Sequence, residues 1–471
     1  GPAFGQAGTK SLTVPTRQEV TLWSDRNVPI IIGKGSIAEG WTISAHHQAS
    51  PLSQNVLLKG DGKTIRNSAS IIETYAGDGS SYENFGGMGG LATSAQIPLP
   101  SSLAMDNEGN LYIAAAHLRS YQNWWHYILK VDTEGIVDIF STAPGTRYAD
   151  GYIALDPQGN IYYSAFFNWY GGASGGCVQK VTPEGQRTTV VGACGPDDYS
   201  FSGIVFRGMH IDNQGNIYAA ASTNMIYKRD PAGVLTVVAG TGVNGTEGDG
   251  GPAVEAQLSN PKDVYLDGDG NLYIAEWSRI RKVDPSGIIT TIAGGGAPGT
   301  VGNGGPATEA YLEGVEEITM DSAGNLYIAE SYNHSVRKVD SHGIITTVAG
   351  FNDNNGGYSG DGIFAGHAQL YHPMDVLVDP AGNVYIADKR NNRVRKIGAP
   401  SAAVEDEIAQ AAFSFAEENG LGHIMSSDLL HMKTVDLNTG VSLYNFDYDG
   451  ENKLVSITDQ FGNTIHIERD A

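Results

Sequence analysis

The sequence is poor in cationic side chains and in long apolar runs. Its 471 residues include 29 Lys and Arg against 52 Asp and Glu, which gives a formal net charge of −23. Such an acidic surface repels phosphate backbones and anionic lipid, so binding to nucleic acid or to a membrane surface is not expected. No apolar run approaches the ~20 residues of a membrane span, and we expect no membrane insertion.

Cysteine is also scarce, because only Cys177 and Cys194 are present. They stand on either side of a turn expected near Pro183, so we expect them to face each other across two neighbouring strands. A disulfide between them is the prediction, and it fits an oxidising compartment. The alternative is two small residues at strand ends that do not pair.

Glycine is abundant, and part of it recurs in a fixed phrase of Gly, Asn, an aliphatic residue and Tyr. Six copies begin at Gly109, Gly159, Gly215, Gly270, Gly324 and Gly382. Successive copies are 50, 56, 55, 54 and 58 residues apart. A near-constant period of this size is typical of a solenoid, a propeller or an array of repeats.

The segment around the fourth copy has the pattern of four short strands. Apolar, β-branched or aromatic runs cover residues 263–267, 270–275, 280–283 and 288–294, with turn residues between them. Asp267–Asn271 and Asp284–Gly287 read as hairpin turns, since Gly allows positive φ and Pro fixes the first turn position. Four strands in a meander form one propeller blade, and we name them A to D from the central axis outward.

The sixth copy ends early, because no fourth strand follows Ile397. A matching run, Ser70–Gly77, stands upstream of the first copy. We therefore predict that this N-terminal strand supplies strand D of the last blade and covers an edge that would otherwise expose unpaired backbone groups. The predicted fold is all-β, a six-bladed propeller over residues 68–398.

The repeats resemble the NHL repeat in the run from Gly270-Asn271-Leu272-Tyr273 through Ile280-Arg281-Lys282-Val283 to Ile289-Thr290-Thr291. The flanking segments carry further resemblances. Tyr444-Asn445-Phe446-Asp447-Tyr448 and Phe461-Gly462-Asn463-Thr464 resemble a YD (Rhs) repeat, and Gly40-Trp41-Thr42-Ile43 resembles the segment before the propeller in teneurins and their bacterial relatives.

This order implies four regions in a bacterial teneurin-like or Rhs-type protein. We expect a small β plug-like segment at 1–67 with a tag remnant at Gly1-Pro2, the NHL propeller at 68–398, a linker with a short helix over Ala402–Glu418 at 399–430, and the start of a YD-repeat β-shell at 431–471. The pattern breaks off at Ala471, so we expect a longer parent protein.

Blades one and two carry extra residues between strands B and C. We expect these insertions, Ala115–Tyr127 and Ala165–Gly176, to form loops on one face of the propeller, and they are rich in aromatic side chains. The interpretation we favour is that they pack on each other or on the YD shell; the alternative is a recognition site for protein or glycan. The candidate binding residues are Tyr121, Trp124, Trp125, His126, Phe166, Phe167, Trp169 and Tyr170.

An enzyme is the rival interpretation, because NHL-type lyases place histidines around an axial zinc. The matching strand A positions here are Ala104, Ala154, His210, Tyr265, Thr319 and Leu377. Only one of these six residues, His210, is a histidine, whereas a zinc site needs three or four ligands. We therefore predict no catalytic residue, no metal and no cofactor. The expected function is binding and scaffolding in a secreted or cell-surface protein, with a protein partner favoured over glycan; the metal-dependent lyase remains the alternative.

Overall fold

The computed structural model of the protein describes most of the propeller, together with short strands that precede and follow it in the sequence. The chain divides into two compact units, Ile72–Ala399 and the combined segments Gly1–Ile71 and Pro400–Ala471. The described residues include no helix with the length and hydropathy of a membrane span. The described ranges are 20–23, 43–46, 59–60, 63–64, 71–80, 85–120, 123–143, 151–168, 174–192, 204–299, 302–350, 356–361, 363–398, 413–416, 421–425, 431–436, 442–448, 454–459 and 464–466.

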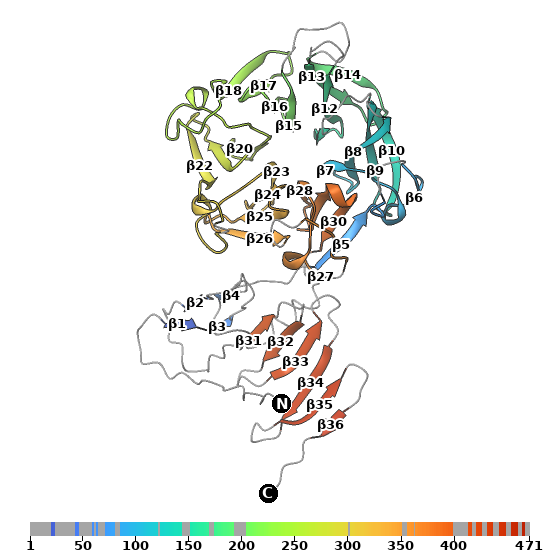
Figure 1. Ribbon diagram of the computed structural model, residues 1–471, viewed down its shortest axis with the longest axis vertical. Helices are drawn as coiled ribbons and strands as arrows, with labels where there is room; N and C mark the ends of the chain where they lie inside the picture. Colours follow the sequence, from blue (N-terminus) through green and yellow to red (C-terminus); the bar gives the residue numbers. More distant parts are fainter. Residues whose placement is uncertain are drawn as a thin grey trace. The chain divides into compact units, whose positions relative to one another are not determined.

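The first of these units is a six-bladed propeller, as predicted, and its six sheets form a ring in Figure 1. Each blade is an antiparallel meander that runs from strand A at the axis to strand D at the rim. Blade one consists of β6 (Gly90–Leu91), β7 (Pro100–Met105), β8 (Leu111–Ser120), β9 (Asn123–Val131) and β10 (Ile136–Ala143). Blade two consists of β11 (Tyr152–Leu155), β12 (Ile161–Asn168), β13 (Ser174–Val181) and β14 (Arg187–Gly192). Blade three consists of β15 (Phe206–Ile211), β16 (Ile217–Ala221), β17 (Met225–Arg229) and β18 (Leu235–Ala239). Blade four consists of β19 (Asp263–Leu266), β20 (Leu272–Glu276), β21 (Arg279–Val283) and β22 (Ile289–Gly294). Blade five consists of β23 (Val315–Met320), β24 (Leu326–Glu330), β25 (Ser335–Val339) and β26 (Ile345–Ala349). Blade six consists of β28 (Pro373–Val378), β29 (Val384–Asp388), β30 (Arg393–Ile397), β5 (Ile71–Ala76) and β27 (Ile363–Phe364).

Blade six is closed by the N-terminal strand, which confirms the predicted ring closure. β5 runs antiparallel to β30, with Ile72 opposite Ile397 and Ala76 opposite Val394. Figure 1 shows this blue strand beside the orange strands of blade six. Further contacts hold the seam: the Thr74 hydroxyl donates to Asp361 Oδ1 at 2.9 Å. The ring is therefore joined by residues from the two ends of the propeller sequence.

The repeated phrase builds the turn between strands A and B. In blade five Asp321 Oδ1 accepts the backbone N–H of Asn325 at 2.9 Å, and Oδ2 accepts the Asn325 side-chain amide at 2.7 Å and the Tyr327 hydroxyl at 3.2 Å. The Lys338 ammonium lies 5.4 Å from the centre of the Tyr327 ring. A lysine covers the corresponding tyrosine in the other blades too, in the pairs Lys130–Tyr112, Lys180–Tyr162, Lys228–Tyr218, Lys282–Tyr273 and Lys396–Tyr385. The phrase is therefore a structural device of the scaffold.

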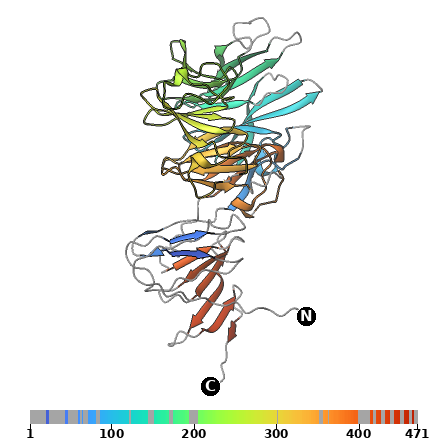
Figure 2. The same cartoon turned by 60° about the vertical axis from the view of Figure 1, so that its left-hand side comes forward.

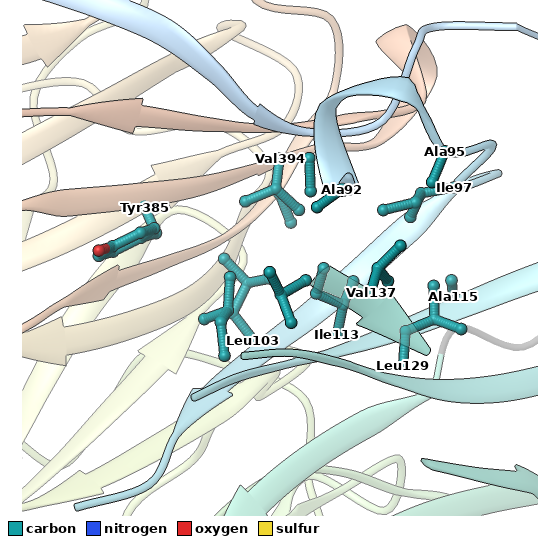
Figure 3. Packing of buried hydrophobic residues seen from close by; sticks show 14 residues of the cluster. Ala92, Ala95, Ile97, Leu103, Ile113, Ala115, Leu129, Val137, Tyr385 and Val394 are labelled. Carbon is teal, nitrogen blue, oxygen red and sulfur yellow. The ribbon is translucent and has the colours of Figure 1, made fainter. Parts of the chain in front are cut away.

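The apolar core lies between neighbouring blades. Figure 3 shows one such cluster, in which Leu103 and Ile113 of blade one lie near Tyr385 and Val394 of blade six. Ala92, which begins the short 3-10 helix η1 (Ala92–Ser94), joins the same cluster. Burial of such residues at ~25 cal/mol per Å² of apolar surface holds the blades together. The corresponding 3-10 turns before other blades are η2 (Ala253–Glu255), η3 (Ala307–Glu309) and η4 (Ala365–His367).

Blades four to six also contain a fully buried arginine on strand C. Arg337 Nη1 lies 3.4 Å from Glu330 Oε2, and its Nη2 donates to Asn303 Oδ1 at 3.0 Å. Arg281 forms an ion pair with Asp249 at 2.6 Å in blade four, and Arg395 forms one with Asp361 at 3.0 Å in blade six. All three arginines have no exposed surface, and each forms an ion pair with at least one carboxylate.

Blade one replaces this arrangement with apolar side chains. Leu129 stands at the arginine position, opposite Ile113 on strand B, just as Arg337 stands opposite Ile328. Ala115 occupies the position of Glu330, and Met88 precedes Gly89-Gly90 as Asn303 precedes Gly304-Gly305. Met88 packs against the cluster that contains Ala115 and Leu129. The acid and the arginine are thus lost together.

The second unit is β-structure in its described parts. β1 (Val20–Trp23) pairs in parallel with β2 (Ile43–His46), and β3 (Lys59–Gly60) pairs with β4 (Lys63–Thr64). The strands β31 (Phe413–Ala416), β32 (Leu421–Met425), β33 (His431–Asp436), β34 (Ser442–Tyr448), β35 (Leu454–Asp459) and β36 (Thr464–His466) form one antiparallel sheet.

The short helix expected over Ala402–Glu418 is wrong where the structure describes that segment. Residues Phe413–Ala416 form β31, which pairs with β32. The prediction weighed the Ala and Glu content, whereas the alternation of Phe413 and Phe415 with small residues is the period-2 pattern of a strand. The sheet therefore begins inside the region 399–430 that was expected to be a linker.

Candidate functional site

Two insertions were expected to form aromatic loops on blades one and two, and they are long hairpins instead. β8 and β9 pair from Leu111–Val131 to Ser120–Asn123 with a register shift between Leu118 and Ser120, and β12 and β13 pair from Ile161–Val181 to Asn168–Ser174. The long cyan strands of blade one lie at the edge of the propeller in Figure 2. The extra residues lengthen both strands because aromatic side chains favour a pleated surface.

The structure locates the candidate binding residues unevenly. Trp124 and Trp125 lie in β9 opposite Leu118 and His117, and Phe166 and Phe167 lie in β12 opposite Gly176 and Gly175. Tyr121, Trp169 and Tyr170 lie outside the described residues.

His126, one of the candidate binding residues, is buried against the neighbouring blade. It is 4% exposed, and its ring centre lies 6.2 Å from that of Tyr163 in the neighbouring blade. Its place in β9 opposite Ala116 turns it into the space between blades one and two. His126 is therefore a packing residue in this structure, not a surface contact.

Cys177 is fully buried in β13 and is not a free thiol. The residue directly opposite it on β14 is Gly192, so the expectation that Cys194 faces it directly is wrong. A β-bulge between Val178 and Gln179 shifts the register of these two strands. Cys194 lies outside the described residues, and its pairing with Cys177 stays a prediction.

Strand A of blade three, β15, carries a histidine that packs against an aromatic ring. The His210 ring lies edge-on to the Tyr265 ring of the next blade, with centres 5.0 Å apart. Burial lowers the pKa of His210 to about 4, against the opposing effect of the Asp212 charge. His210 is therefore neutral at ordinary pH.

Three buried carboxyl groups lie near the start of strand A in blades four, five and six. Asp263 accepts the backbone N–H of Ile318 at 3.0 Å, and Asp375 accepts that of Leu103. Ser102 donates to Glu317 Oε2 at 3.3 Å. Burial raises the pKa of Asp263, Glu317 and Asp375. Within the described ranges, no three His, Cys, Asp or Glu side chains are grouped so as to hold a metal ion.

An aromatic row crosses the face that carries the B–C connections of blades four and five. It runs from Trp277 to Tyr332 at 5.0 Å between ring centres, then to His372 at 5.5 Å, to His334 at 5.0 Å and on to Tyr371 at 5.5 Å. Tyr332 is 49% exposed, whereas His334 is buried. We call Trp277, Tyr332, His372, His334 and Tyr371 the aromatic row.

Charged groups lie at both ends of the aromatic row. Lys262 lies 5.5 Å from the Trp277 ring centre and pairs with Glu316 at 2.7 Å. Arg390 lies 5.2 Å from the Tyr371 ring centre and donates to the Tyr371 hydroxyl at 3.2 Å. The row combines exposed ring surface with polar groups, which is what a recognition surface requires.

The aromatic row is not evident in the sequence because its members come from two kinds of segment. Trp277, Tyr332 and His334 follow strand B, but His372 and Tyr371 precede strand A of the next blade. No single repeat is enriched in aromatic residues there. If each B–C connection is aligned with the segment before strand A of the following blade, the five aromatic residues fall next to one another.

Comparison with known families bears on the propeller directly. Residues 178–298, which run from β13 of blade two past β22 of blade four, match the family model of the teneurin NHL domain. Over this part the propeller is similar to the teneurin NHL domain, and we call it the NHL domain below. This agrees with the NHL and teneurin resemblance drawn from the repeats.

The similarity to teneurins extends beyond the NHL domain match. The chain is 26% identical to teneurin-1 of Gallus gallus over 97% of its own length, and 26% identical to teneurin-m of Drosophila melanogaster over 92%. It spans 18% and 17% of those proteins, so it corresponds to a small part of each. The similarity covers the flanking segments as well as the NHL domain.

Solved structures support the fold of the NHL domain. A protein of unknown function from Bacteroides thetaiotaomicron aligns with a TM-score of 0.53 at 17% identity, covering 72% of this chain and 78% of that one. An auxiliary nutrient binding protein from the same organism aligns with a TM-score of 0.52 at 16% identity over the same shares. At this identity the likeness concerns architecture alone.

Proposed function

We propose that this chain is a non-enzymatic binding and scaffold module of a large teneurin-like protein at the cell surface or outside the cell. The observation that carries the proposal is the similarity to teneurins over 97% of the chain, which includes both flanks of the propeller. The partner is a protein, either a surface protein in adhesion or a YD-type shell of the same parent chain.

The aromatic row is the part of the NHL domain best suited to contact that partner. Tyr332 offers half-exposed ring surface, and Trp277 and His372 hold it edge-on from two sides. Aromatic anchors of this kind dominate the energetics of protein interfaces when polar groups surround them. The ion pair of Lys262 with Glu316 supplies such a polar neighbour.

The test measures adhesion and docking separately. Beads coated with the chain are scored for aggregation with one another and with cells, and the chain is tested for binding to the downstream part of its parent protein. Replacing Trp277 and Tyr332 with Ala together should reduce one of the two activities at least tenfold, since interface aromatics contribute ~2 kcal/mol each.

Val234→Ala is the matched control. Val234 is 56% exposed and lies in a C–D turn, at the end of the blades opposite to the aromatic row. This substitution should leave both activities unchanged. The proposal fails if neither aggregation nor docking occurs, or if the control variant loses as much binding as the Trp277 and Tyr332 double variant.

A further inference from the structure

Neighbouring blades are joined by a repeated hydrogen bond between two residues in the left-handed backbone region. Asn224 Oδ1 accepts the backbone N–H of Asn260 at 3.1 Å, between blades three and four. Asn392 Oδ1 accepts the N–H of Leu99 at 3.0 Å, between blades six and one. The four residues have φ angles of 57°, 52°, 51° and 47°. We call this bond the inter-blade latch.

Between blades five and six the same position holds a histidine pair. His334 Nδ1 accepts the backbone N–H of His372 at 3.2 Å, and the φ angles are 51° and 53°. His334 follows strand B of its blade as Asn224 and Asn392 follow theirs. Nδ1 of histidine is bonded to Cγ, as Oδ1 of asparagine is, so the two acceptors occupy the same place.

The two acceptors differ in their response to pH. An amide oxygen stays an acceptor across the physiological range, whereas imidazole gains a proton near pH 6.5. To accept the N–H of His372, Nδ1 of His334 must carry no hydrogen, and the neutral ring then holds its proton on Nε2. Protonation would set an N–H of the His334 ring against the backbone N–H of His372.

Protonation would also add a charge to a crowded site. His334 is 9% exposed, and the His372 ring centre lies 5.0 Å away. Glu330 already accepts bonds from Asn333 and Ser335, and Asp388 accepts the backbone N–H of Tyr371 at 2.7 Å. Among the described residues, Tyr332 and Tyr371 are titratable and each lies with its ring centre 5.5 Å from a histidine ring of the pair. Glu330, Asp388 and Arg390 contact Asn333 and Tyr371, the residues that precede the two histidines in the chain.

We propose that the bond between His334 and His372 is a pH-sensitive inter-blade latch, closed when His334 is neutral and open when it is protonated. The stabilisation is complete above the pKa of the ring and is lost as the pH falls through it, because only the neutral ring accepts. At the other two junctions the acceptors are the side chains of Asn224 and Asn392, which do not titrate. The inference stands independently of the proposed function.

The first experiment compares the full chain with its His334→Asn variant, which installs the side chain that accepts the bond at the two asparagine junctions. Thermal unfolding is followed from pH 8 to pH 5. The Tm of the two proteins should agree at pH 8, and the wild type should lose about 2 °C more than the variant by pH 5. Other titrating groups, Asp388 included, are present in both proteins and cancel in the comparison.

Two further variants separate the causes. His372→Asn keeps the backbone donor and removes the second imidazole, so its unfolding should retain most of the pH dependence. Asn224→His should give the junction of blades three and four a pH dependence that it lacks. If the His334→Asn variant loses as much Tm as the wild type on acidification, the latch does not act as proposed.

A direct measurement on the wild type removes any dependence on the folding of a variant. In protein labelled with ¹⁵N at histidine, NMR identifies which ring nitrogen of His334 carries the proton. We expect the Nε2–H tautomer at pH 8 and a shift of the His372 amide resonance that follows the titration of His334. A hydrogen on Nδ1 at pH 8, or a His372 amide that does not respond, would overturn the proposal.

Discussion

Nη1 of Arg337 lies 3.4 Å from Oε2 of Glu330 inside blade five, and neither side chain has any exposed surface. Burial raises the pKa of Glu330, and the Arg337 charge acts against that rise. Blade one holds Leu129 and Ala115 at the same two positions. One propeller thus contains both an ionic and an apolar version of the same interior.

Replacing only one member of the Arg337–Glu330 pair should lower the free energy of unfolding. Arg337→Leu leaves Glu330 buried without its cation and should lower the free energy of unfolding by about 3–5 kcal/mol. Arg337→Leu combined with Glu330→Ala installs two of the three blade-one side chains and should recover part of that loss, since Asn303 remains. Urea denaturation monitored by tryptophan fluorescence measures both, and equal losses in the single and double variants would contradict the expectation.

The His210 ring should make the stability of the NHL domain sensitive to acid. Because burial lowers its pKa to about 4, the folded protein binds fewer protons than the unfolded chain between about pH 6.5 and about pH 4. The contribution of His210 is complete above this window and is lost as the pH falls through it. His210→Phe keeps the edge-on contact with Tyr265 and should flatten the decline in Tm.

The turn aspartate of the repeat should matter more than the aspartate at the other turn of the same blade. Asp321 accepts two side-chain donors, from Asn325 and Tyr327, in addition to backbone N–H groups. Asp321→Ala should therefore cost about 2–3 kcal/mol of unfolding free energy. Asp340 accepts two backbone N–H groups, and Asp340→Ala should cost about 1 kcal/mol. Equal effects in denaturation would show that the side-chain donors of the phrase add nothing.

Two glycines of blade five offer a matched test of close packing. Gly350 and Gly343 have φ angles of +88° and +77°, so both favour glycine. A Cβ on Gly350 would lie 2.2 Å from the His334 carbonyl oxygen, whereas a Cβ on Gly343 meets nothing within 4 Å. Gly343→Ala should cost about 1 kcal/mol through backbone strain alone. Gly350→Ala should cost clearly more, and calorimetry on both variants measures the difference.

Periodicity predicted the blades well because each repeat has the same local chemistry. The turn bonds of Asp321, Asn325 and Tyr327 lie within a few residues, so the sequence displays them directly. The missing strand after Ile397 and its copy at Ile71–Ala76 likewise predicted the seam between β5 and β30. These features depend on short-range patterns or on counting.

Other features become visible only when the copies of the repeat are compared position by position. Glu330 and Arg337 appear in blades four to six as Glu or Asp with Arg, and blade one has Ala115 with Leu129, a joint change that no single repeat reveals. The long hairpins of blades one and two were interpreted as loops because added length alone does not distinguish a loop from two longer strands.

The seam at blade six has a mechanical consequence. The chain enters the NHL domain at β5 and leaves it at β30, and the antiparallel pairing puts the entry residue Ile72 opposite the exit residue Ile397. A force that pulled the two flanking segments apart would load the hydrogen bonds of this pair one after another, starting from that end. Under tension the ring would peel open at blade six while the other blades carried no load.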